Sequence, residues 1–372
     1  MATLNINYRF IFRIFMVILF VVFAWFFPSI ILYIFLAFIL ALMGKPLANA
    51  ICSVTVFKRH IPYSICSLLA ILIFLVIMVL TITLFIPMMI KEVRTIENID
   101  YEQLAYYLNN SLNRLQYFLY DNGLMELDQT IVGALIGEIN NFVNVESFTN
   151  ILGNVVSTTG SFLMGLFAVF FMAFFFIKDD IRIEKLAEVF ISNKYTQRMK
   201  LISEKINSLL TRYCVGSFIR IMIMIVLLYI GFLLFGIKNS LFHAFFGGVL
   251  NIIPYLGPII GVVISCIFGF INCISMDMYT EIIPVMIKIT GIYVVANVID
   301  NVLLQPLIFS QSVKIHPVEV FLVTILGGDM AGMTGMILAI PVYTIIRIIL
   351  IEIYNFTNKS TLLIEKKVQQ VE

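Results

Sequence analysis

The chain has 372 residues and a formal net charge of +2, with 61% hydrophobic and 12% charged residues. Soluble domains hold about 45–50% apolar and about 25% charged residues, so this chain has too few polar side chains to cover the surface of a soluble fold. The weak net charge excludes a nucleic-acid binder, which needs a concentrated basic face. The composition therefore predicts an all-α polytopic membrane protein.

Residues 1–90 are predicted to form the first three transmembrane helices. No charged residue occurs in residues 14–44, and Pro28 within this stretch predicts a turn between two short helices. Because no small-x-small cleavage site follows the first apolar stretch, we expect an uncleaved helical hairpin rather than a signal peptide. The uncharged interval 61–90 is long enough for a third crossing.

Residues 91–152 are predicted to form a small helical extramembrane insertion on the outer side. Residues 91–150 carry nine acidic and three basic residues, whereas residues 178–205 carry seven basic ones. Lysine and arginine are enriched in cytoplasmic loops, so this asymmetry predicts a cytoplasmic membrane protein with both termini in the cytoplasm. Leucines at steps of three and four indicate an amphipathic helix in the insertion. They are Leu104, Leu108, Leu112, Leu115 and Leu119.

The second half of the chain is predicted to hold the transport core. Residues 153–206 contain the fourth transmembrane helix and a cytoplasmic amphipathic helix, residues 207–352 form the core, and residues 353–372 form a cytoplasmic tail. The five cysteines show no CxxC or Cys/His spacing and lie in or beside apolar runs, so we expect small buried hydrophobic residues. They are Cys52, Cys66, Cys214, Cys266 and Cys273.

Two glycine-rich interruptions divide the apolar sequence of the core, at residues 247–261 and 327–335. As one straight helix residues 241–273 would be about 50 Å long, against about 30 Å of hydrocarbon. Proline removes a backbone donor, so the first interruption predicts a broken helix with free backbone groups at membrane depth. Such breaks point to a transporter's binding site, and kinks that aid packing are the alternative.

Because of the two breaks, the predicted number of transmembrane helices lies between six and eight. If both broken segments cross fully there are eight, and if both are re-entrant hairpins there are six. The re-entrant arrangement places Asp277 and Glu281 outside and Lys314 inside, which agrees slightly better with the charge asymmetry.

Polar residues recur within the apolar segment 283–305. Three lie at steps of four and form one stripe with Asp300 beside it: Asn297, Asn301 and Gln305. An ionisable group inside a membrane costs about 2.5–3.5 kcal/mol, so Asp300 is predicted to handle a proton or cation. Asp329 in the second break is its expected partner and Lys288 an alternative counter-ion. The structural alternative is an internal salt bridge or interhelical hydrogen bonds, and for Arg220 we favour a structural role.

The candidate substrate-binding residues combine the two breaks with the stripe. They are Asn251, Pro254, Tyr255, Gly257, Pro258, Asn297, Asp300, Asn301, Gln305, Gly328 and Asp329. A Na⁺ ion is considered at Asp300 and Asp329, and three scattered histidines predict no other metal site. The sequence contains no GxxxxGK[ST], HExxH or GxSxG motif, so we expect neither an enzyme nor a cofactor, and transport would use a gradient.

The segment Gly248 to Gly261, GVLNIIPYLGPIIG, resembles the autoinducer-2 exporter family of PerM-like permeases. The resemblance continues in NVIDN at 297–301, in SVKIHP at 312–317 and in the glycines of 327–335, and it covers nearly the whole chain. It implies an integral membrane transporter, because members are described as exporting the quorum-sensing signal autoinducer-2 or as exchanging Na⁺ or Li⁺ for H⁺. It also implies a homo-oligomer, with a pentamer as the suggested number.

Three functions are therefore open. The first is a secondary transporter of the cytoplasmic membrane that exports a small polar solute such as autoinducer-2 by means of an ion gradient. The second is a Na⁺(Li⁺)/H⁺ antiporter. The third is a non-transporting membrane scaffold that acts through the external insertion. The expected partners are the lipid bilayer, a small-molecule or ion substrate and further copies of the chain, without nucleic acid.

Overall fold

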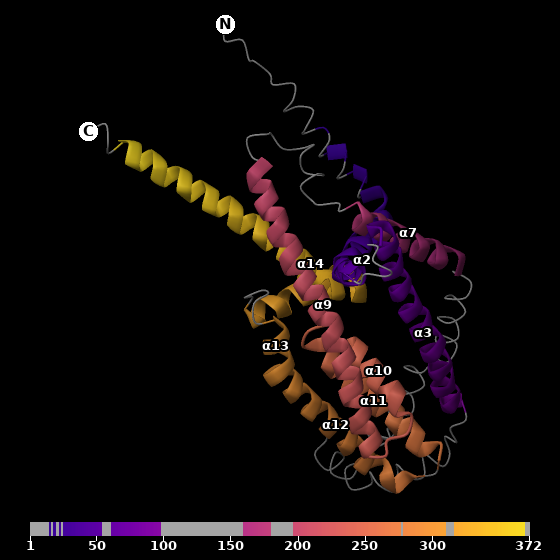
Figure 1. Ribbon diagram of the computed structural model, residues 1–372. Coiled ribbons are helices and arrows are strands. Elements are labelled where there is room, and N and C mark those ends of the chain that lie inside the picture. Colours follow the sequence, from indigo (N-terminus) through magenta and orange to yellow (C-terminus); the bar gives the residue numbers. More distant parts are fainter. Residues whose placement is uncertain are drawn as a thin grey trace. The chain divides into compact units, whose positions relative to one another are not determined.

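The computed structural model describes residues 25–53, 61–97, 159–179, 196–276, 278–309 and 316–368, with isolated positions between 15 and 23. Apart from short turns, the chain is helical in these ranges and contains no strand there (Figure 1). Six of the described helices are long and apolar enough to cross a membrane, which confirms the predicted all-α polytopic fold. The external insertion beyond residue 97 and residues 180–195 of the amphipathic helix lie outside the described residues.

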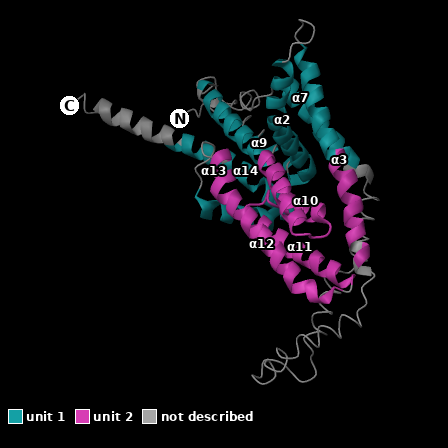
Figure 2. Ribbon diagram, turned by 60° about the horizontal axis from the view of Figure 1, so that its bottom comes forward, with its two compact units in different colours: residues 1–78, 163–217, 309–372 teal, residues 79–162, 218–308 magenta. Residues whose placement is uncertain are grey.

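The chain divides into two compact units, which are coloured separately in Figure 2. Unit 1 comprises residues 1–78, 163–217 and 309–372, and unit 2 comprises residues 79–162 and 218–308. Helices α3 (Tyr63–Glu97) and α9 (Thr196–Leu234) contribute residues to both units. Each unit is described below by itself.

Unit 1 is held together by small side chains. Its helices α2 (Pro28–Ser53) and α7 (Thr159–Lys178) pack with the first part of α3. The buried residues of this cluster are Ala37, Ala41, Ala48, Cys66, Ala70, Ile71, Ala173 and Ile177. Small residues let apolar helices approach closely in a membrane, where no hydrophobic force drives helices together.

Cys52 near the end of α2 and Cys66 near the start of α3 form a disulfide in unit 1. The prediction of small buried hydrophobic residues holds for the burial of Cys66 but does not include this pairing. A spacing of 14 residues matches no motif, so the pairing depends on how α2 and α3 meet and is invisible in the sequence. Cys214, Cys266 and Cys273 are free and buried or half-buried, as predicted.

The second predicted break is a helical hairpin within α14 (Pro317–Val368). The helical path is interrupted at Ala331 and at Gly332, which has a φ of 59°. A Cβ atom on Gly335 would overlap the carbonyl oxygen of Gly327, so the two limbs touch backbone to backbone. The segment Pro317–Glu352, which by length and hydropathy passes for one span, therefore folds back on itself.

Spin labels at Glu319 and Tyr343 would test this hairpin. The Tyr343 hydroxyl donates to Glu319 Oε2 at 2.6 Å, which fixes the register of the two limbs. Packed helices have axes about 8–10 Å apart, so pulsed EPR should give a label separation below about 20 Å. In one straight helix these positions would be about 36 Å apart, and a distance near that value would contradict the hairpin.

Unit 2 gathers the C-terminal part of α9 with α10 (Ser240–Leu250), α11 (Leu256–Ile274), the short helix η2 (Tyr279–Glu281) and α12 (Ile282–Ile299). The helix continues as the π-helical turn η3 (Asp300–Leu304) and α13 (Gln305–Phe309). Its core is formed mainly by residues of α9 and α12. They include Met224, Leu228, Phe232, Ile289, Ile292, Tyr293 and Ala296.

The first predicted break is the helical hairpin α10–α11, which folds about residues 251–255 (Figure 1). A Cβ atom on Gly261 would lie 3.4 Å from the Cα atom of Gly247, so the limbs run antiparallel in close contact. Helix α10 has 11 residues, or about 16 Å, which is too short for about 30 Å of hydrocarbon. Its length favours the re-entrant arrangement over two full crossings.

The four glycines of this break lie in the two helices and not in the turn between them. Gly247 and Gly248 lie inside α10, Gly257 and Gly261 lie inside α11, and none of the four has a positive φ. A Cβ atom on Gly248 would lie 2.9 Å from the backbone nitrogen of Ile225 in α9. These glycines therefore allow close helix packing, and the chain reverses only in the turn between them.

Helix α3 continues to Glu97, seven residues beyond the predicted boundary at residue 90. Its Phe85 packs against Phe242 of α10, and Met88 and Met89 belong to the same apolar cluster of unit 2. Glu92, which was counted among the acids of a solvated insertion, has a side chain that is only 1% exposed. The last turns of α3 are thus part of unit 2.

Candidate functional site

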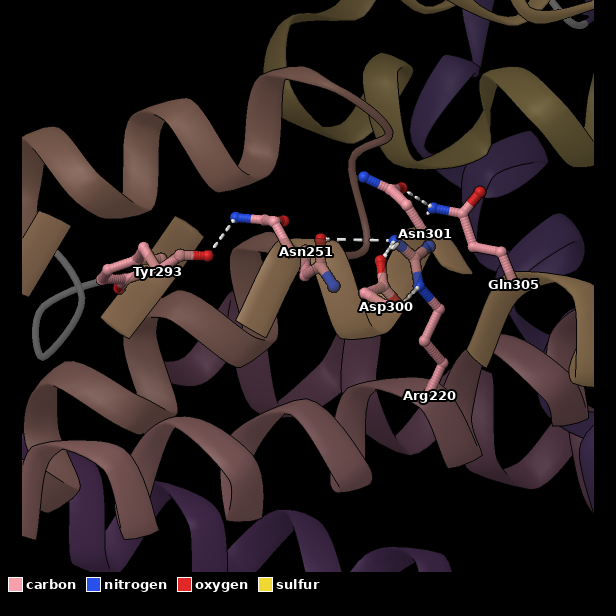
Figure 3. A network of polar contacts seen from close by, with 7 residues as sticks. Arg220, Asn251, Tyr293, Asp300, Asn301 and Gln305 are labelled. Atoms are coloured by element: carbon pink, nitrogen blue, oxygen red, sulfur yellow. Dashed lines mark hydrogen bonds and ion pairs between the residues drawn. The ribbon is translucent and has the colours of Figure 1, made fainter. Parts of the chain in front are cut away.

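A buried ion pair lies in unit 2, where α9 meets the turn η3. Arg220 Nε donates to Asp300 Oδ1 at 2.7 Å, and Arg220 Nη2 donates to Asp300 Oδ2 (Figure 3). The Asp300 side chain is 1% exposed and that of Arg220 is 11% exposed. Two parallel charge-assisted hydrogen bonds fix both orientation and charge, so the pair is neutral as a whole and rigid.

The π-helical turn η3 places Asp300 at this position. The backbone N–H of Gln305 donates to the carbonyl oxygen of Asp300, the five-residue step that defines a π-turn. The Gln305 side chain also contacts this turn. Its Nε2 atom lies 3.3 Å from Asp300 Oδ2 and 2.5 Å from Asn301 Oδ1. Single π-turns inside α-helices are rare and frequently mark functional sites.

The turn of the α10–α11 hairpin brings Asn251 to the ion pair. Arg220 Nη2 donates to Asn251 Oδ1 at 3.4 Å. An arginine can only donate, so this contact sets the orientation of the Asn251 amide and turns its Nδ2 away from Arg220. That Nδ2 atom is buried and has no hydrogen-bond partner among the described residues. A buried donor of this kind is available for a ligand oxygen or water.

Most backbone N–H groups of the turn form hydrogen bonds within the turn itself. The N–H groups of residues 251, 252, 253 and 257 all donate to carbonyl oxygens within the segment 247–253. Leu256 N donates to Pro254 O at 2.7 Å across Tyr255, a γ-turn in which Tyr255 has a φ of 62°. The prediction of free backbone donors at the first break is therefore wrong for these residues, because a tight turn closes its own hydrogen bonds.

Tyr293 of α12 is inserted against both limbs of the hairpin. A Cβ atom on Gly247 would overlap its hydroxyl, and one on Gly261 would lie 3.2 Å from its ring. The buried hydroxyl lies 2.8 Å from Ser265 Oγ in α11 and donates to the carbonyl oxygen of His243 in α10 at 3.3 Å. Tyr293 therefore couples the position of α12, and with it Asp300, to the hairpin.

The predicted polar stripe does not stay on one face. Asp300 is buried, Asn297 and Gln305 are half-buried, and Asn301 is exposed, because the π-turn shifts the register of the helix after Asp300. The amide of Asn297 donates to the carbonyl oxygen of Tyr293 within its own helix at 2.9 Å. Asp300 and Asn251 meet at the ion pair, whereas Asn301 reaches it only through Gln305.

The counter-ion of Asp300 is Arg220, and not Lys288. Lys288 lies three turns earlier on the same helix, so it cannot reach the carboxylate. The signal that could have identified Arg220 is its charge, which is the only one in the apolar run 213–236 and is opposite to that of Asp300. The suggested pairing of Asp300 with Asp329 stays a prediction, because Asp329 belongs to unit 1.

The remaining candidate residues lie at the two hairpin turns. Pro254 and Tyr255 are in the first turn, and Pro258 is in the first turn of α11, where proline is tolerated. A Cβ atom on Gly257 would overlap the carbonyl oxygen of Leu250. In unit 1 a Cβ atom on Gly328 would lie 2.5 Å from Met336 Cε, and Asp329 is exposed near the second turn. Among the described residues no group of three or more His, Cys, Asp or Glu is placed to hold a metal ion.

Similar proteins agree with a role in membrane transport. The chain is 24% identical over 298 residues to a candidate transport protein of Bacillus subtilis, YueF, an alignment that covers 79% of this chain and 78% of YueF. It is 20% identical over 299 residues to the candidate transport protein MJ1177 of Methanocaldococcus jannaschii, covering 79% and 81% of the two chains. The candidate permease PerM of Escherichia coli is 23% identical over 180 residues, 48% of each chain.

The model of one protein family matches nearly the whole chain. The match extends over residues 14–355 and includes both hairpins and the Arg220–Asp300 pair. Together with the helices of membrane-spanning length and composition, it assigns the chain to multi-pass membrane proteins with a role in transport. The chain belongs to the AI-2E family of transporters.

Proposed function

We propose that the protein is a secondary transporter that exports a small polar solute such as autoinducer-2, using an ion gradient. The observation that supports this proposal is the buried and unpartnered Nδ2 donor of Asn251 beside the Arg220–Asp300 pair. A ligand hydroxyl or carbonyl oxygen would satisfy that donor. A furanone-type sugar derivative carries several such oxygens and no charge.

The ion pair favours an uncharged solute over a bare cation at this position. Both Asp300 oxygens accept hydrogen bonds from Arg220, so a Na⁺ ion would have to displace the guanidinium group from a buried carboxylate. Breaking a buried ion pair in this way costs about 3–5 kcal/mol. A neutral polar solute can bind to Asn251 without opening the pair.

Replacing Asn251 with Leu tests the proposal. The substitution keeps the size of the side chain and removes the donor, so the initial rate of autoinducer-2 accumulation in proteoliposomes should fall about tenfold, the value of one hydrogen bond. Thr280→Val, an exposed change in η2, is the matched control and should transport normally. Absence of accumulation above empty liposomes for the unaltered protein would exclude this substrate. An unchanged rate for Asn251→Leu would exclude the proposed site.

A Na⁺(Li⁺)/H⁺ antiporter is the second candidate, and the buried carboxylate Glu92 of unit 2, which is held by the side-chain amides of Asn239 and Asn272, favours it. In that case a Na⁺ gradient should drive proton release from proteoliposomes that contain no organic solute. Asp300→Asn should abolish this release. A scaffold without transport would show neither activity.

We also propose a cytoplasmic membrane location with both termini in the cytoplasm, and a homo-oligomeric assembly. The asymmetry between the acidic residues 91–150 and the basic residues 178–205 supports the orientation. Single cysteines introduced at the two termini of the chain, labelled in whole cells and in inverted vesicles, would check the orientation. Native mass spectrometry of the purified protein would count the copies.

A further inference from the structure

An apolar groove lies in unit 1 between α3 and α7. It has a volume of about 490 Å³ and is lined by three residues of α3 and seven of α7, all of which are leucine, isoleucine or phenylalanine. The three residues of α3 follow steps of three and four, so they share one face of that helix. They are Leu68, Ile71 and Leu75. Ligand pockets have volumes of roughly 300–1,000 Å³ and mainly apolar walls, so this groove has the size of a binding site.

Aromatic rings form much of the α7 wall of the groove. The ring centroids of Phe167 and Phe171 are 5.6 Å apart and those of Phe171 and Phe175 are 4.9 Å apart, which are distances of favourable ring contacts. On the α3 side Ile71 is only 6% exposed and belongs to the cluster of small side chains that joins α2, α3 and α7. The groove therefore has a wall of mutually packed rings and a floor that is part of the core of unit 1.

The length of the groove matches one leaflet of a bilayer. Its lining residues on α7 extend from Leu163 to Phe175, which is about 18 Å along the helix. The hydrocarbon core of a membrane is about 30 Å thick, so the acyl chains of one leaflet extend over about 15 Å. An acyl chain that lies along α7 would therefore contact leucine, isoleucine and phenylalanine side chains over its whole length.

A positive charge lies at one end of the groove. Lys178 is the last residue of α7, and its Nζ atom is 5.9 Å from the ring centroid of Phe174 and 5.5 Å from that of Phe175, two lining residues. Its side chain is exposed, and no carboxylate that the structure describes forms an ion pair with it. The acid that follows it, Asp179, is exposed as well. Contact with the ring faces holds the ammonium group near the groove while it stays hydrated.

We propose that the groove between α3 and α7 binds one acyl chain of an anionic phospholipid, whose headgroup phosphate contacts the Lys178 ammonium group. The apolar lining accepts the chain, and the lysine supplies the charge that an anionic headgroup needs. In a zwitterionic phospholipid the phosphate is compensated by a cation of the same headgroup, so this lipid should bind more weakly. The proposal does not depend on the proposed transport of a solute, because lipid binding can be measured without transport.

A helix of a second copy of the chain is the other apolar occupant to consider, and the groove fits it less well. A volume of about 490 Å³ along about 18 Å leaves a cross-section on the order of 30 Å². A helix with its side chains is about 10–12 Å wide and needs a cross-section of about 80 Å² or more. It could therefore insert only single side chains, and the apolar helix faces that the groove suits would offer no anion to Lys178.

Fluorescence quenching by phospholipids with brominated acyl chains tests the proposal at the groove itself. The chain has a single tryptophan, Trp25, so Trp25→Phe with Phe171→Trp places the only reporter in the groove. In phosphatidylcholine bilayers, brominated phosphatidylglycerol should bind at this reporter about fivefold more tightly than brominated phosphatidylcholine, the contribution of one lysine beside an anionic headgroup. Trp25→Phe with Leu72→Trp is the matched control. Leu72 is exposed on α3 outside the groove, so its reporter should show no preference.

Changes at Lys178 test the headgroup contact. In the groove reporter, Lys178→Gln should remove the preference for phosphatidylglycerol and Lys178→Arg should keep it. Lys200→Gln, which removes an exposed lysine of α9 in unit 1 that does not line the groove, should also keep it.

The unaltered protein provides a measurement that depends on no variant. Native mass spectrometry with equal amounts of the two lipids should show more bound phosphatidylglycerol than phosphatidylcholine per chain. Equal binding of both lipids would overturn the proposal, and so would an undiminished preference in Lys178→Gln. A groove reporter that no brominated lipid quenches would overturn it too, because the groove would then be filled by protein.

Discussion

Replacing Asp300 with Asn is expected to abolish transport and to lower the free energy of unfolding by about 3–5 kcal/mol. The change leaves Arg220 largely buried with its charge uncompensated, because the hydrogen bond that it donates to Asn251 Oδ1 is long, at 3.4 Å, and its acceptor is neutral. Steric trapping in bicelles would measure the stability. Accumulation of labelled solute in proteoliposomes would measure transport.

A double variant separates the structural role of the pair from its functional role. Arg220→Met with Asp300→Leu removes both charges and keeps the volume, so stability should return to within about 1 kcal/mol of the unaltered protein. Transport should stay reduced by about tenfold, as for Asn251→Leu, because the residue that orients Asn251 is absent. Full transport by the double variant would show that the pair serves only the fold.

Replacing Gly257 with Ala is expected to disrupt the first hairpin. The added methyl group would overlap the carbonyl oxygen of Leu250 and lie 3.1 Å from the Cα atom of Asn251. Backbone atoms cannot move aside as a side chain can, so the cost should reach or exceed the roughly 1–3 kcal/mol typical of overpacking. Size-exclusion chromatography of a fluorescent fusion would show a reduced folded fraction and, for the folded remainder, reduced solute accumulation.

Gly291→Ala is the matched control for this change. Gly291 is in α12 and exposed, and a Cβ atom there would meet no heavy atom within 4 Å. Alanine at such a helical position should be neutral or stabilise the protein by up to about 1 kcal/mol. If both variants fold equally well, the close backbone contact at Gly257 does not exist.

The parts of the fold that depend on local composition could be predicted from the sequence. Apolar runs between charges gave the membrane-spanning helices, and the concentration of glycine and proline at 247–261 and 327–335 located both hairpins. The burial of Asp300 was also expected, since a carboxylate in an apolar helix must face protein or water. These inferences need only hydropathy and the length of a helix.

The parts that depend on tertiary contacts could not be predicted. Arg220 and Asp300 are 80 residues apart, and Glu92 is 147 and 180 residues from the asparagines that bind it. Charge counting along the chain assigned Glu92 to a solvated insertion, because the continuation of α3 into unit 2 has no local signal. The π-turn at Asp300 was equally hidden, and it moved Asn301 to the surface.

The backbone N–H groups of the 251–255 turn are engaged within the turn, and this has a consequence for how related proteins could differ in substrate. A frame whose backbone donors are already engaged contributes little to recognition, so under the proposed function discrimination would rest on side chains such as that of Asn251. Glycine and proline can then persist in the frame while a single exchange at the turn alters which solute is accepted. Under the proposed function, proteins that share this turn would change cargo through single side-chain substitutions that leave its backbone frame in place.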